Sequence, residues 1–137
     1  MKTKKVIAII EASSTGFGIY VQDDTLPLTS YGDTIEEAKA DLQSVLKDMV
    51  DAYKESKEAL PPAYNQGNIA FVYKYDIASI FRHFGMLDIS GFAKKVGLNP
   101  SLLRQYKGGH AIAGPNQKKK IEEGLHAIGR ELLSVKL

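Results

Sequence analysis

The sequence predicts an α+β protein in which a β-β-β-α-β domain at residues 1–75 precedes an all-helical domain at residues 76–137. Short β-branched or alternating runs and one long amphipathic stripe make up the first domain, whereas the second holds four shorter stripes at helical spacing. The charge also changes along the chain. Residues 1–67 carry 7 Lys and no Arg against 11 Asp and Glu, a net charge of −4, and residues 68–137 carry 11 Lys and Arg against 5 acidic residues, a net charge of +6. An acidic half and a basic half indicate two different partners.

Four strands are predicted in the first domain. Residues 6–11 form an apolar run rich in β-branched side chains, and residues 17–21 alternate after a turn-forming segment. Residues 28–31 form a weaker strand, and Pro27 places it at a sheet edge or fixes its first residue. Residues 69–75 alternate again. Because a helix separates the third strand from the fourth, we expect a parallel or mixed pairing for the last strand.

The first domain holds one long helix, which is predicted to begin after Thr34 and to end near Glu58. Thr34 and Glu37 form a capping box, in which each side chain bonds an otherwise unpaired backbone N–H. The segment 60–68 is rich in helix-breaking residues and is a predicted loop. The helix carries one apolar stripe, which is expected to pack across one face of the sheet: Ile35, Ala38, Leu42, Val45, Leu46, Met49 and Tyr53.

Residues 88–107 are predicted to form two short helices joined by a tight turn. Ala93 is small enough for two helices to cross closely, and Gly97 can adopt the positive φ that the turn needs. Asn99 is a favourable N-cap, and Pro100 suits the first helical position. A small residue followed four positions later by glycine, with apolar residues around them, is typical of a DNA-binding helix-turn-helix. An ordinary helical hairpin, or a helix-turn-helix used for protein contacts, is the alternative.

Two further helices complete the second domain in this prediction. One begins at Asp76 and ends at Gly85, and the last begins at Pro115. The glycine pair 108–109 is predicted to stop the second helix of the motif. We therefore expect four helices around one core.

The second helix of the motif is predicted to read DNA with side chains that the core does not use. Leu103 and Tyr106 are expected to face inward. Arg104 can contact guanine O6 and N7 with two hydrogen bonds, and Gln105 can pair with adenine. Lysines beside the motif are expected to contact phosphates. The predicted DNA-binding residues are Asn99, Ser101, Arg104, Gln105, Lys107 and Lys118.

At residues 32–38, which follow two predicted strands, and at residues 88–107, the chain resembles the HicB antitoxin family. The resemblance implies a degenerate RNase H-like first domain and a helix-turn-helix second domain. It further implies an antitoxin of a HicA–HicB type II toxin–antitoxin pair. The first domain would neutralise a basic, RNA-cleaving HicA-like toxin, and the second would bind double-stranded operator DNA and repress its own operon. A homodimer or higher homo-oligomer is expected, because a two-fold axis matches two DNA half-sites.

Two other function classes stay open. A helix-turn-helix transcription regulator whose first domain senses a ligand or only dimerises would share the same pattern. A small nuclease would need clustered carboxylates that hold two metal ions. The candidate acids do not form such a set, because Glu11 ends the first strand whereas Asp23 and Asp24 lie in a turn and Asp33 precedes the helix. We therefore expect no enzyme, no catalytic residue, no metal and no cofactor.

The amino-acid composition bears on disulfides, metal sites and localisation. The chain has no Cys, which excludes a disulfide framework and a thiolate zinc site, and its three histidines are not spaced as metal ligands. Because no run approaches the ~20 apolar residues of a membrane helix and the start does not resemble a signal peptide, we expect a cytoplasmic protein. Tyr73 and Tyr75 alternate with Lys74 on the last strand. Packing against the helix is favoured over stacking on single-stranded nucleic acid for these tyrosines.

Overall fold

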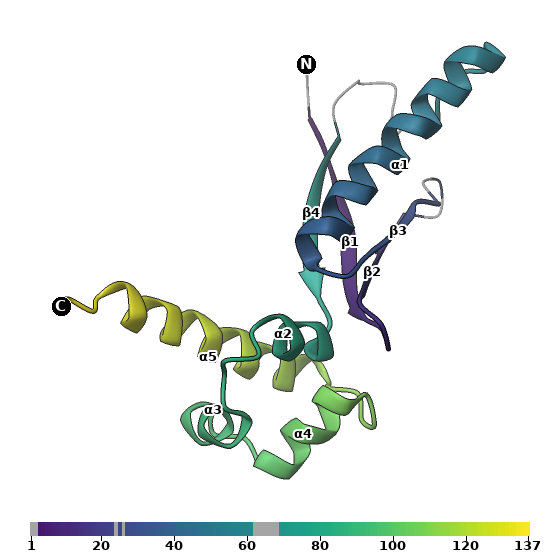
Figure 1. Cartoon of the computed structure of the whole chain (residues 1–137). Coiled ribbons are helices and arrows are strands. Elements are labelled where there is room, and N and C mark those ends of the chain that lie inside the picture. Colours follow the sequence, from purple (N-terminus) through teal and green to yellow (C-terminus); the bar gives the residue numbers. More distant parts are fainter. Residues whose placement is uncertain (1–2, 24, 26, 62–68) are drawn as a thin grey trace. The chain divides into compact units, whose positions relative to one another are not determined.

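The computed structural model describes residues 3–23, 25, 27–61 and 69–137. Its internal contacts divide the chain into two units, Met1–His83 and Phe84–Leu137. Among the described residues, the first unit holds a four-stranded mixed sheet and two helices, and the second holds three helices (Figure 1). The prediction of an α+β protein is therefore confirmed. No helix in this part of the chain combines the length and the apolar composition that a membrane span requires.

The sheet of the first unit has the strand order β3-β2-β1-β4. Its strands are β1 (Lys4–Ala12), β2 (Phe17–Val21), β3 (Thr29–Gly32) and β4 (Ile69–Tyr75). β1 pairs antiparallel with β2 and parallel with β4, and β2 pairs antiparallel with β3. All four predicted strands and the mixed pairing are confirmed. The predicted loop at 60–68 falls largely on residues 62–68, which lie outside the described residues.

Helix α1 (Ile35–Ser56) lies across one face of this sheet (Figure 1). The Thr34 hydroxyl accepts a hydrogen bond from the Glu37 N–H at 3.1 Å, and the Glu37 carboxylate accepts one from the Asp33 N–H at 3.0 Å. The predicted capping box is therefore present, although its return bond goes to the residue before the cap. The helix ends at Lys57, which adopts a left-handed conformation with φ of 58°, close to the predicted end.

The core of the first unit lies between α1 and the sheet. Gly32 closes this core at the start of α1, because a Cβ on it would lie only 2.4 Å from the backbone nitrogen of Ala38. Burying each large aliphatic or aromatic side chain here stabilises the fold by roughly 1.5–3 kcal/mol. The buried apolar residues alternate along β1 and β2 and recur at helical spacing in α1: Val6, Ala8, Ile10, Phe17, Ile19, Val21, Leu28, Ile35, Ala38 and Leu42.

Helix α2 (Ile77–His83) belongs to the first unit, not to the helical domain in which the sequence placed it. The buried Ser79 hydroxyl donates to the carbonyl oxygens of Ile10, at 3.3 Å, and Asp76, at 2.8 Å. The Arg82 guanidinium donates to the carbonyl oxygens of Ser13 and Gly16. These polar contacts to β1 and the following turn fix α2 on the sheet. The division by internal contacts falls after His83, whereas the sequence predicted a boundary after Tyr75.

The second unit contains α3 (Ile89–Val96), α4 (Pro100–Gly108) and α5 (Pro115–Leu133). Gly97 and Gly109 end α3 and α4, each with φ of 77°, a conformation that favours glycine. The unit thus has three helices where four were predicted, because α2 lies in the other unit. The predicted turn at Gly97 is confirmed, and so is the predicted stop at the glycine pair 108–109, because Gly108 is the last residue of α4 and Gly109 caps it.

The helices of the second unit pack around a small apolar core. Ala93 is fully buried, as expected for a residue at a close helix contact. Gly124 plays a similar part in α5, because a Cβ on it would lie 2.0 Å from Cγ1 of Val96. The absence of a side chain there lets α5 approach α3. The other buried members of this core are Phe92, Leu98, Leu103, Tyr106, Ala113 and Ile121.

Candidate nucleic-acid interface

Helix α4 divides its side chains between the core and solvent. Leu103 has no exposed surface and Tyr106 is 7% exposed. Both therefore face inward, as the sequence predicts. The predicted DNA-reading residues on this helix, Ser101, Arg104, Gln105 and Lys107, are all exposed. A helix with one anchored apolar side and one exposed polar side can present hydrogen-bonding groups to a large polar partner.

Both ends of α4 are fixed by local interactions. The Asn99 side-chain oxygen accepts hydrogen bonds from the N–H groups of Ser101, at 2.8 Å, and Leu102, at 3.3 Å. Pro100 occupies the first helical position, and Gly109 forms the left-handed cap at the other end. Because the Asn99 oxygen is used by the cap, its NH₂ group is the part of this side chain left to contact a partner.

Arg104 does not extend alone from α4. Its Nη2 donates a hydrogen bond to the Ser90 hydroxyl oxygen on α3, over 2.6 Å. Ser90 is not among the DNA-binding residues predicted from the sequence. Its place in the first turn of α3, two residues after the N-cap Asp88, was visible in the sequence. The direction in which Arg104 extends was not visible in the sequence.

Lys118 lies on a different helix from the other predicted residues. It is exposed in the first turn of α5 and is followed by the exposed Lys119 and Lys120. Gly114 caps this helix without a side-chain hydrogen bond. The N–H groups and partial positive charge at a helix start add to the lysine charges. The start of α5 is therefore a cationic surface on the same unit as α4.

The second unit is basic as a whole. It carries nine Lys and Arg against four Asp and Glu, a net charge of +5, whereas the first unit carries nine against twelve, a net charge of −3. One ion pair, between Lys95 Nζ and Glu131 Oε2 at 2.8 Å, offsets part of this charge. Exposed pairs of this kind contribute little to stability. The excess positive charge is available to attract phosphates.

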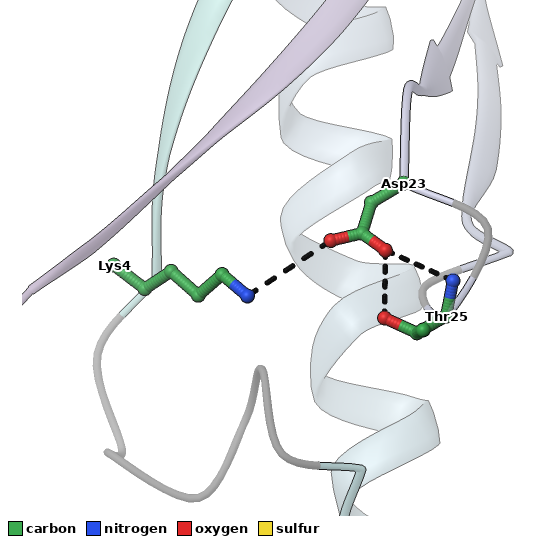
Figure 2. A network of polar contacts seen from close by, with 3 residues as sticks. All are labelled: Lys4, Asp23 and Thr25. Atoms are coloured by element: carbon green, nitrogen blue, oxygen red, sulfur yellow. Dashed lines mark hydrogen bonds and ion pairs between the residues drawn. The ribbon is translucent and has the colours of Figure 1, made fainter.

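Those acidic residues considered for catalysis that the structure describes do not form a metal-binding cluster. Asp23 accepts hydrogen bonds from the Thr25 hydroxyl at 2.6 Å and the Thr25 N–H at 2.9 Å, with Lys4 Nζ at 3.9 Å (Figure 2). The hydroxyl bond, then the N–H bond and the Lys4 charge, hold the pKa of Asp23 below its ordinary value of 3.8. Asp24 lies outside the described residues. Within the described ranges, no group of three His, Asp or Glu residues is placed to hold a metal ion.

Tyr73 is used in packing. Its ring lies 6.2 Å from that of Phe71, and Lys39 of α1 places its ammonium 4.5 Å from the Tyr73 ring centre. Burial raises the pKa of the Tyr73 phenol. The favoured expectation, that alternate residues of β4 pack against α1, is confirmed. A stacking surface for single-stranded nucleic acid does not fit these contacts.

An open depression of about 520 Å³ lies on the first unit, between the β1–β2 turn, the start of α1 and the end of α2. Phe17 forms its apolar part, with the His83 ring edge-on at 6.4 Å and the Arg82 guanidinium 6.0 Å from the ring centre. Asp33 and Glu36 bring carboxylates to the same depression. Its mixed charges could accommodate a small polar molecule.

Comparison of the chain with protein-family models, with curated proteins and with solved structures found no match.

Proposed function

We propose that the second unit binds double-stranded operator DNA, with α3 and α4 acting as a helix-turn-helix, and that the protein is a HicB-type antitoxin. The observation that carries the DNA-binding part is the division of α4. Leu103 and Tyr106 are buried, whereas Ser101, Arg104, Gln105 and Lys107 are exposed on a unit with a net charge of +5. Base edges in the major groove are read by side chains of this kind, and phosphates attract the positive charge.

Operator DNA would be bound by two copies of the chain. In a helix-turn-helix dimer, each recognition helix enters the major groove of one half-site, and the half-sites lie about 34–36 Å apart. The preferred DNA sequence should therefore be an inverted repeat. A single copy would contact one half-site, and its affinity would depend mainly on phosphate contacts and on salt.

The first unit would bind the toxin. Its β-β-β-α-β order is the order that the HicB resemblance implies for a degenerate RNase H-like domain. Its net charge of −3 complements a basic RNA-cleaving protein, and opposite charges raise the rate of encounter. In this proposal the first unit has no catalytic role and binds no metal or cofactor. It acts by covering the toxin's RNA-binding surface.

A second candidate is a helix-turn-helix regulator whose first unit senses a small ligand. The depression beside Phe17, Arg82 and His83 is the observation that favours it. Its lining combines one aromatic ring with cationic and anionic groups, which suits a small zwitterionic or polar ligand. This candidate shares the DNA-binding second unit with the antitoxin and differs in what the first unit binds.

One co-expression experiment separates the two candidates. The full chain is produced with the protein encoded by the adjacent reading frame, purified through a tag on this chain, and titrated against duplex DNA from upstream of its own gene. We expect the adjacent protein to co-purify and to show ribonuclease activity only after it is separated. Sequence-selective DNA binding without any co-purifying protein favours the regulator instead. Absence of DNA binding contradicts both.

A further inference from the structure

The hydrogen bond between Arg104 and Ser90 joins the two helices of the proposed DNA-binding motif. The residues lie 14 positions apart, on α4 and α3, and the Nη2–Oγ distance is 2.6 Å. A charge-assisted hydrogen bond of this length is stronger than one between neutral groups. It restrains an exposed side chain that otherwise samples many rotamers.

Ser90 is itself held on a fixed part of the unit. The Asp88 carboxylate caps α3 by accepting a hydrogen bond from the Gly91 N–H at 2.9 Å, on the residue that follows Ser90. Phe92 and Ala93 of the same helix are buried in the core. The hydroxyl oxygen of Ser90 is therefore a fixed acceptor, and it determines where the end of Arg104 lies.

The bond leaves the guanidinium able to bind a second partner. Arginine has five N–H donors in one plane, and the Ser90 hydroxyl accepts from one of them. The remaining donors include enough for the two-bond contact with guanine O6 and N7. A side chain already held near its bound orientation loses less conformational entropy when it binds.

We propose that Ser90 is a positioning residue for DNA recognition, holding the Arg104 guanidinium in the orientation that reads a base. This inference rests on the proposed function and adds a specificity determinant outside α4. Base preference at one position of each half-site then depends on a serine of the preceding helix. Ser90 acts through Arg104 and needs no base contact of its own.

The test begins with the preferred duplex of the full-length protein, selected from random DNA. The selected duplex, and one with the Arg104-dependent base pair changed, are titrated against the wild type, Ser90→Ala, Ser90→Thr and Arg104→Ala by fluorescence anisotropy. Ser90→Ala should lower discrimination between the two duplexes by about two- to tenfold. Ser90→Thr keeps the hydroxyl and should discriminate between the two duplexes as the wild type does. The salt dependence should stay unchanged, because no phosphate contact is lost.

The double variant Ser90→Ala, Arg104→Ala separates positioning from an independent contact. If Ser90 acts through Arg104, removing Ser90 has no further effect once Arg104 is gone. Ser44→Ala, at an exposed serine of α1, is the matched control and should bind like the wild type. Thermal melting of each variant distinguishes lost specificity from lost folding.

Each outcome bears on the proposal. Unchanged discrimination in Ser90→Ala overturns it, and so does an additive loss in the double variant. Tighter binding by Ser90→Ala also overturns it, since Ser90 would then hold Arg104 away from DNA. In all three cases the wild type still selects a DNA sequence, so the proposed function stands. If the wild type selects no sequence, the proposed function falls and this inference with it.

Discussion

The hydroxyl of Ser79 donates a hydrogen bond to the carbonyl oxygen of Ile10, 3.3 Å away, although 69 positions separate the two residues. Ser79 has no exposed surface. The same carbonyl accepts a hydrogen bond from the Asp76 N–H at 2.9 Å. The start of α2 is thus joined to one carbonyl of β1 by two hydrogen bonds, which explains why this helix folds with the sheet.

Ser79→Ala should therefore destabilise the first unit. The carbonyl of Ile10 keeps its bond from Asp76, so the loss is that of the buried hydroxyl bond alone, about 1 kcal/mol in the free energy of unfolding. Urea titration followed by circular dichroism measures the change. Ser44→Ala, at an exposed position of α1, is the control and should lie within about 0.5 kcal/mol of the wild type. Equal stability of the two variants would contradict the assigned contact.

Gly124→Ala should destabilise the second unit. The added Cβ would lie 2.0 Å from Cγ1 and 3.1 Å from Cβ of Val96, and a β-branched valine has little freedom to move aside. Overpacking of this kind costs about 1–3 kcal/mol, partly offset by the better helix propensity of alanine. The midpoint of chemical denaturation measures it.

Gly129 provides the matched control for this substitution. It lies in the same helix, and a Cβ there meets nothing within 4 Å. Gly129→Ala should leave stability unchanged or raise it by up to about 1 kcal/mol. Shortening the neighbour with Val96→Ala should recover part of the loss in Gly124→Ala. Equal effects at the two glycines would show that α5 does not approach α3 this closely.

Local signals in the sequence predicted much of this fold. Thr34, Gly97 and Asn99 act within a few residues of their own positions, so caps and turns could be recognised without knowledge of the tertiary structure. The boundary between the units could not be recognised in this way. It depends on the contact between Ser79 and β1, which apolar spacing does not reveal.

The candidate interface was predictable to a similar degree. The inward faces of Leu103 and Tyr106 follow from helical periodicity, and the exposure of Arg104 follows with them. The partner of Arg104 does not follow, because a long side chain can extend toward several neighbours. Its bond to Ser90 depends on how α3 and α4 cross, and that geometry is absent from the sequence pattern.

The lowered pKa of Asp23 predicts a dependence of stability on pH. A carboxyl whose pKa is lower in the folded state stabilises the fold above its unfolded pKa, and that stabilisation is lost as the pH falls through the folded value. The wild type should therefore be more stable than Asp23→Asn near neutral pH, and the difference should vanish below the ordinary value of 3.8. Denaturation at several pH values between neutral and strongly acidic measures this. If the stability difference between the wild type and Asp23→Asn persisted in strong acid, it would come from the shape of the side chain and not from its charge.

Arg104→Ala should lower affinity for the selected operator by about 1–3 kcal/mol and relax the preference at one base pair of each half-site. Lys118→Ala is the matched comparison, because it removes a charge from the same unit. It should weaken binding to all duplexes alike and reduce the slope of affinity against salt by about one. Gel-shift titration of specific and unrelated duplexes at several salt concentrations measures both. An Arg104→Ala variant with unchanged base preference would place the reading surface elsewhere.

The two units should be separable in function. Arg104 lies in the unit that begins at Phe84, and the proposed toxin-binding unit ends at His83. Arg104→Ala should therefore weaken operator binding and relax its base preference while the adjacent gene's protein still co-purifies and stays inactive. Because α2 is bonded to β1 through Ser79, a fragment that retains the toxin partner should end after His83 and not after Tyr75. The Tyr75 fragment lacks α2 and should bind less of that protein, by pull-down and by protection of RNA from cleavage. Equal capture by both fragments would show that α2 is dispensable for the first unit. A complex formed by residues 84–137 alone would overturn the antitoxin proposal and leave the ligand-sensing or dimerising regulator as the better account.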